Sequence, residues 1–122
     1  MSSAEHDRRI DYIEFPATSI PEAKRFYSSV FGWTFEDYGP DYASFADGRL
    51  SGGFQTAARV HSGGPLVVIY AVDLEVMERK VRQAGGVITL AIFSFPGGHR
   101  FHFTDPSGNQ LAVWSDQNKG EQ

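Results

Sequence analysis

The 122-residue sequence has no cysteine and comparatively little positive charge, and each shortage excludes a class of function. Without cysteine the chain can form no disulfide, no thiolate nucleophile and no cysteine-ligated zinc site. Its 11 Lys and Arg residues are outnumbered by 15 Asp and Glu residues, which gives a formal net charge of -4. A chain without a basic patch is a poor binder of phosphates, so we expect no nucleic-acid partner.

Long apolar segments are also missing. The longest apolar run, 66–72, suits a buried strand and is far too short to cross a bilayer. The first residues are charged, with no apolar segment behind them, which does not fit a signal peptide. We therefore expect a cytoplasmic protein with no membrane partner, folded as a single domain over residues 1–122.

The stretch 97–115 carries the clearest structural signal and predicts a hairpin. Residues 99–104 alternate between aromatic and polar side chains, and residues 110–115 alternate as well, as strands with one buried face do. Asp105, Pro106 and Gly108 between them are typical turn residues. This register places Leu111 and Val113 against the helix expected over 74–84, and Ala112 and Trp114 on the opposite face.

Two capped helices show that the chain is duplicated. Ser19 and Asp73 are good N-caps and lie 54 positions apart (73 minus 19), while the glycine stops Gly32 and Gly85 lie 53 apart (85 minus 32). Each half reads as a strand, a helix and three further strands. We predict an α+β protein of two βαβββ modules, over about 10–58 and 66–116, joined by a polar linker.

This order of motifs resembles the vicinal oxygen chelate superfamily, which includes glyoxalase I, extradiol dioxygenases, and fosfomycin- and bleomycin-resistance proteins. The resemblance covers about 10–115 and rests on Phe26-Tyr27, Phe31-Gly32-Trp33, Val72-Asp73-Leu74, Gly85-Gly86 and Asp105-Pro106-Ser107-Gly108-Asn109. It implies curved mixed sheets around a concave cavity, helices on the outer faces, a ligand in the cavity and a homodimer.

The resemblance also implies where a metal would bind in the metal-dependent members. Its ligand positions fall on Tyr12, on a residue within 50–55 where Gln55 is the plausible donor, on Val67 and on Ala112. Valine and alanine have no lone pair to offer a cation. We therefore expect no metal and no other cofactor.

Candidate site residues come from the strands that the resemblance places around the cavity. Glu14 and His102 are the candidate acid–base pair, with Arg100 or His102 as the partner that a buried Glu14 would need. The alternatives are an exposed or structurally paired Glu14 and an ordinary sheet histidine. The expected ligand-binding residues are Tyr12, Phe54, Val67, Ile69, Arg100, Ala112 and Trp114; the alternative is that the aromatic ones pack a dimer interface or fill the cavity.

These features predict a metal-free protein that binds a small organic ligand in its concave cavity, for example to sequester a toxic compound or an antibiotic. The alternative is an enzyme. It would be a glyoxalase-type lyase or isomerase, similar to lactoylglutathione lyase, or a dioxygenase-like protein, using a rebuilt metal site or the pair Glu14 and His102.

Overall fold

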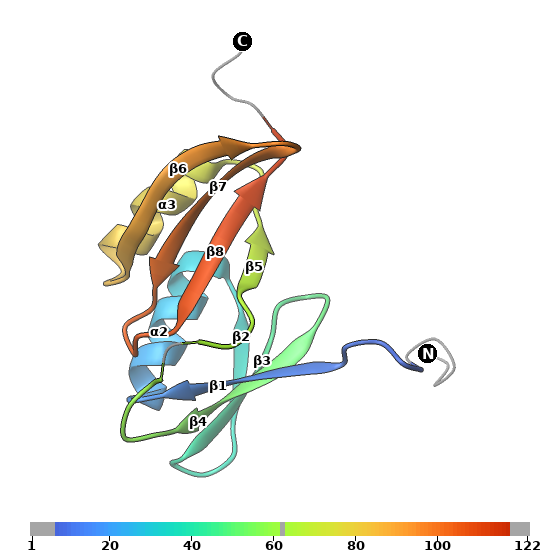
Figure 1. Ribbon diagram of the computed structural model, residues 1–122. Helices are drawn as coiled ribbons and strands as arrows, with labels where there is room; N and C mark the ends of the chain where they lie inside the picture. Colours follow the sequence, from blue (N-terminus) through green and yellow to red (C-terminus); the bar gives the residue numbers. More distant parts are fainter. Residues whose placement is uncertain (1–6, 62, 118–122) are drawn as a thin grey trace.

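The computed structural model describes residues 7–61 and 63–117, which form two βαβββ modules (Figure 1). The first module contains β1 (Tyr12–Ala17), α2 (Ile20–Phe31), β2 (Thr34–Asp37), β3 (Tyr42–Ala46) and β4 (Ser51–Thr56). The second contains β5 (Val67–Tyr70), α3 (Leu74–Gln83), β6 (Val87–Phe95), β7 (Gly98–Thr104) and β8 (Gln110–Ser115).

Each module makes its own mixed sheet. The strand orders are β1-β4-β3-β2 and β5-β8-β7-β6, with the first strand of each module parallel to its last and the other pairs antiparallel. The predicted α+β class, built from two βαβββ modules, is confirmed. Within 7–61 and 63–117, neither helix has the length and apolar content needed to span a bilayer.

Both helices begin at the predicted caps. The Ser19 hydroxyl accepts a hydrogen bond from the Glu22 amide at 3.2 Å, and the Asp73 carboxylate accepts one from the Val76 amide at 3.2 Å. Gly32 ends α2 in the left-handed conformation, with φ of 73°. Local sequence therefore fixes where the helices start and where α2 ends.

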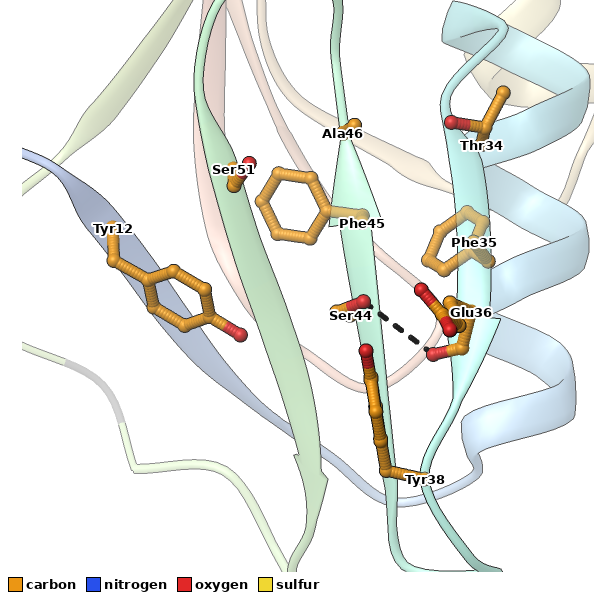
Figure 2. A pocket seen from close by; sticks show the side chains of 9 residues that line it. All are labelled: Tyr12, Thr34, Phe35, Glu36, Tyr38, Ser44, Phe45, Ala46 and Ser51. Carbon is orange, nitrogen blue, oxygen red and sulfur yellow. Dashed lines mark hydrogen bonds between the residues drawn. The ribbon is translucent and has the colours of Figure 1, made fainter.

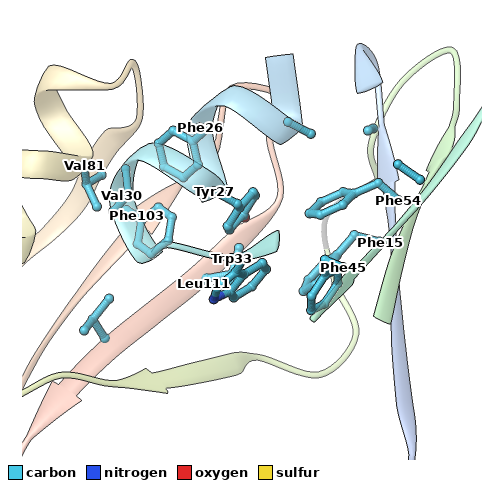
Figure 3. Close-up of a cluster of buried hydrophobic side chains, with 14 of the residues drawn as sticks. Phe15, Phe26, Tyr27, Val30, Trp33, Phe45, Phe54, Val81, Phe103 and Leu111 are labelled. Atoms are coloured by element: carbon cyan, nitrogen blue, oxygen red, sulfur yellow. The ribbon is translucent and has the colours of Figure 1, made fainter. Parts of the chain in front are cut away.

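Helix α2 lies between the two sheets and joins them in one hydrophobic core (Figure 3). The ring of Tyr27 is 5.1 Å from that of Phe54 in the first sheet, and the ring of Phe26 is 6.0 Å from that of Phe103 in the second. Each sheet turns one face toward this core. We call the opposite face of each sheet its open face.

The register of the β7–β8 hairpin agrees with the prediction. Phe101 pairs with Val113 and Phe103 with Leu111, and all of these side chains are fully buried in the core. The alternate pairs, Arg100 with Trp114 and His102 with Ala112, lie on the open face of the second sheet.

The turn between β7 and β8 connects the two modules through the buried carboxylate of Asp105, which is 4% exposed. Asp105 accepts hydrogen bonds from the Tyr27 hydroxyl at 2.9 Å and from the Asn109 amide group at 3.0 Å. The same amide group donates to the Pro16 carbonyl at 2.7 Å. Burial, assisted by the Asp105 charge, raises the pKa of Tyr27 well above its usual range. The turn thus ties the second sheet to α2 and to β1.

The two faces of β8 differ in what they contribute to stability, which gives a first prediction. Leu111→Ala removes a fully buried aliphatic side chain and should lower the free energy of unfolding by about 2–5 kcal/mol. Trp114→Ala, on the open face, should cost clearly less. Urea unfolding of both variants tests this, and an equal loss for the two would contradict the assigned faces.

Candidate functional site

The structure separates the predicted site residues into three groups. The open face of the first sheet carries Tyr12 and Glu14. The open face of the second sheet carries Arg100, His102, Ala112 and Trp114. Phe54 lies in the core, and Val67 and Ile69 are partly buried and pack against it.

The placement of Phe54, Val67 and Ile69 in the cavity is wrong. Phe54 is fully buried and stacks on Phe15 at 5.3 Å. In the parallel pairing of β5 with β8, Val67 lies opposite Leu111, so Val67 and Ile69 share the core face. Val68 and Tyr70 occupy the open face instead, one residue further along the strand.

Aromatic rings surround Arg100 on the open face of the second sheet. Its guanidinium carbon lies 5.5 Å from the ring centroids of both Phe93 and Phe95, within the range of a cation–π interaction. Trp114, the cross-strand partner of Arg100, lies 6.4 Å from Phe95 and meets the Tyr70 ring edge-on at 5.2 Å. This face therefore combines a permanent positive charge with several apolar rings.

Two buried polar atoms on this face lack a hydrogen-bond partner among the described residues. They are Nε of Arg100 and Nε2 of His102. Burying a polar group without a partner costs about 1–3 kcal/mol, so nearly all such groups in folded proteins are paired. Burial, with a smaller contribution from the Arg100 charge, lowers the pKa of His102. The histidine is therefore neutral at pH 7, and both atoms are suited to a bound polar group.

A different arrangement occupies the open face of the first sheet. The Tyr42 hydroxyl donates to the Glu14 carboxylate at 3.0 Å and lies 2.5 Å from the Tyr12 hydroxyl. Burial and these two hydrogen bonds raise the pKa of Tyr42. Gly53 makes room for the arrangement, because a Cβ atom there would lie 2.0 Å from the Tyr42 hydroxyl oxygen.

The expected partner of Glu14 is therefore corrected. Its carboxylate is bonded to Tyr42, and within 7–61 and 63–117 no hydrogen bond or ion pair joins it to Arg100 or His102. Residue patterns did not single out Tyr42. The alternation of side chains along β3 puts Tyr42 and Ala43 on opposite faces of the sheet. This pattern could not show that the Tyr42 hydroxyl would contact Glu14 on β1.

A hollow of about 540 Å³ lies on the open face of the first sheet, near its β2 and β3 strands (Figure 2). We call it the first-sheet hollow; it is lined by Tyr12, Thr34, Phe35, Glu36, Tyr38, Ser44, Phe45, Ala46 and Ser51. Of these residues, only Tyr12 is a ligand-binding candidate by its sequence.

Two of the four positions that the resemblance assigned to metal ligands offer no donor to a divalent cation. Val67 packs against the core, and Ala112 has no donor atom. The Tyr12 hydroxyl is hydrogen-bonded to the Tyr42 hydroxyl. In the part of the chain that the structure describes, no three His, Cys, Asp or Glu side chains come together as a metal site.

Comparison with known proteins agrees with this fold. The sequence model of the Glyoxalase/Bleomycin resistance protein/Dioxygenase superfamily matches residues 9–113. The proteins named "Putative glyoxylase CFP32" of Mycobacterium bovis and Mycobacterium tuberculosis are 28% identical over an alignment of 117 residues that covers 85% of this chain. The chain spans 44% of the length of these relatives.

Solved structures share the fold at low sequence identity. A glyoxalase/bleomycin resistance protein/dioxygenase family enzyme from Burkholderia phytofirmans PsJN superposes with a TM-score of 0.76 at 16% identity, covering 87% of this chain and 98% of its own. The fosfomycin resistance protein FosX from Listeria monocytogenes, a mutant complexed with Mn(II) and 1S,2S-dihydroxypropylphosphonic acid, gives 0.78 at 9% identity, covering 92% of each chain.

His102 should make stability depend on pH. In the unfolded chain His102 takes up a proton near pH 6.5, whereas the folded state holds it neutral to lower pH. The free energy of unfolding should therefore fall as the pH drops through about 6.5 toward the folded pKa.

The variant His102→Gln isolates this contribution because it keeps His61 and His99. Urea unfolding between about pH 5 and pH 8 should show a shallower pH dependence in His102→Gln than in the wild type. Identical slopes for the two proteins would show that His102 is not held neutral.

Proposed function

Since the chain belongs to the Glyoxalase/Bleomycin resistance protein/Dioxygenase superfamily, we propose that it binds a small organic molecule without a metal ion. The ligand lies on the open face of the second sheet, against Arg100, His102 and Trp114. The observation that carries this proposal is the pair of unpartnered buried nitrogens, Nε of Arg100 and Nε2 of His102. A hydrogen-bond acceptor on the ligand would satisfy Nε of Arg100, and Nε2 of His102 would donate or accept according to the imidazole tautomer.

The surroundings of these nitrogens favour an organic ligand over an inorganic ion. Tyr70, Phe93, Phe95 and Trp114 present ring faces and edges around the charge. A planar apolar group packs against such rings while its polar group meets Arg100.

The side chains at the family's ligand positions support binding without a metal. Val67 and Ala112 contribute no lone pair, so a Lewis-acid role would need donors from elsewhere. Sequestration of a toxic compound or an antibiotic is one concrete form of the proposal, in keeping with the fosfomycin resistance proteins among the structural neighbours.

A glyoxalase-type enzyme is the second candidate, and the hydrogen bond between Tyr42 and Glu14 favours it. A carboxylate 3.0 Å from a phenol is an arrangement that can accept and return a proton. The mycobacterial relatives carry a glyoxylase name, but they are more than twice as long as the stretch they share with this chain. Formation of lactoylglutathione, abolished in Glu14→Gln, would establish this activity.

The aromatic sulfonate 8-anilino-1-naphthalenesulfonate is a suitable probe of the proposed site, since it combines fused rings with an anion. Its fluorescence should report binding to the wild type. Arg100→Gln should weaken binding about tenfold, because a hydrogen bond to a charged group contributes about 1.5–3 kcal/mol. Trp114→Ala should weaken it about fivefold through lost ring contact.

The control is Arg79→Gln, which removes the same charge from an exposed position on α3. It should bind the probe as the wild type does, and added EDTA should change nothing. Equal affinities for Arg100→Gln and Arg79→Gln would refute the proposed site. Loss of binding in EDTA would refute its independence from metal.

We also propose that the protein forms a homodimer that covers part of its open faces. Tyr12, Val68, Tyr70 and Leu90 are 42–48% exposed there, and a second copy of the chain would remove this apolar surface from water. Size-exclusion chromatography with light scattering should give twice the mass of one chain at micromolar concentration. The mass of a single chain under these conditions would contradict the proposal.

A further inference from the structure

The first-sheet hollow is separate from the site proposed above, and we propose that it binds an organic cation, such as a primary ammonium group attached to an apolar body. The hollow lies among strands of the first sheet (Figure 2). Arg100 and His102 belong to the second sheet. Its volume of about 540 Å³ falls within the range of small-molecule sites. The directions of the hydroxyl protons around the hollow favour a cationic ligand.

The Tyr12 hydroxyl presents an acceptor to the hollow. Tyr42 has one hydroxyl proton and donates it to Glu14, so the hydrogen bond between the two tyrosines needs the proton of Tyr12. With its proton committed to Tyr42, the Tyr12 oxygen has only lone pairs left. Any ligand that meets this oxygen has to supply the proton.

The opposite wall of the hollow is also rich in acceptors. Ser44 directs its hydroxyl proton to the backbone carbonyl of Glu36, at 3.5 Å. The Glu36 carboxylate raises the pKa of Tyr38 by hydrogen bonding and by its charge, which keeps the Tyr38 proton in place. Glu36 adds the negative charge, and the residues that line the hollow include no Lys, Arg or His.

Aromatic side chains complete the preference for a cation. Tyr12 and Tyr38 line the hollow, and Figure 2 shows the Tyr12 ring beside the strand that carries Ser51. The ring of Phe45 points to the core side of the sheet, where it stacks on Trp33 at 4.4 Å. Ring faces attract ammonium groups, and this attraction adds to that of a nearby carboxylate. Donor-rich and positively charged ligands therefore match the hollow, whereas carboxylates and phosphates do not.

Benzylamine, benzyl alcohol and benzoate test this inference, because they share a phenyl ring and differ in charge. Titrations followed by NMR should show benzylamine shifting the amide signals of Glu36, Tyr38 and Ser44. Benzyl alcohol should bind at least tenfold more weakly, and benzoate should leave these signals unchanged.

Glu36→Gln should weaken benzylamine binding about tenfold, because it removes the charge and keeps the side chain's shape. The matched control is Glu75→Gln, which removes one exposed carboxylate from α3 and should have no effect. Thermal melts check that both variants are folded, and Tyr12→Phe serves as a second variant that should also weaken binding.

Equal binding of benzylamine and benzyl alcohol would overturn the inference, as would equal affinities of Glu36→Gln and Glu75→Gln for benzylamine. Shifts confined to the second sheet would do so as well. Because the probes and variants differ from those used for the Arg100 site, either proposal can fail while the other stands.

Discussion

The buried carboxylate of Asp105 is the contact through which the two halves of this protein are held in place. It accepts hydrogen bonds from the backbone amides of Ser107 and Asn109 in the turn. It also accepts a hydrogen bond from the hydroxyl group of Tyr27 on α2. A buried carboxylate is tolerated only where enough donors surround it, and here those donors come from both modules. The turn that sets the register of the second sheet is thus also the point where that sheet meets the first module.

The shared core has a direct consequence for function. Since α2 packs against both sheets, each sheet has one face committed to hydrophobic packing and one face left open. Strand alternation then places Glu14, Arg100 and His102 on the open faces, away from the residues of the shared core. Chemistry can vary on these faces with little cost to the fold, which agrees with neighbours that share the fold at 9–16% identity.

The two open faces differ in charge and in hydrogen-bonding character. On the second sheet, Arg100 and His102 leave nitrogens without partners among aromatic rings. On the first, hydroxyl protons are directed toward carboxylate or carbonyl oxygens, and the hollow presents acceptors beside Glu36. One face is therefore suited to an acceptor-bearing ligand and the other to a donor-bearing one, and a single ligand class would not satisfy both.

The sequence alone determined the features that depend on neighbouring residues. The caps at Ser19 and Asp73, the turn at Asp105 and the alternation along β7 and β8 are local signals, and they were sufficient for the module order and for the faces of Leu111 and Trp114. Tertiary structure decided what depends on pairing between distant strands. The run 66–72 is apolar throughout, so only its pairing with β8 showed that Val67 and Ile69 face the core. The partner of Glu14 was likewise undetermined, because Tyr42 reaches it only after β3, β4 and β1 assemble around the space left by Gly53.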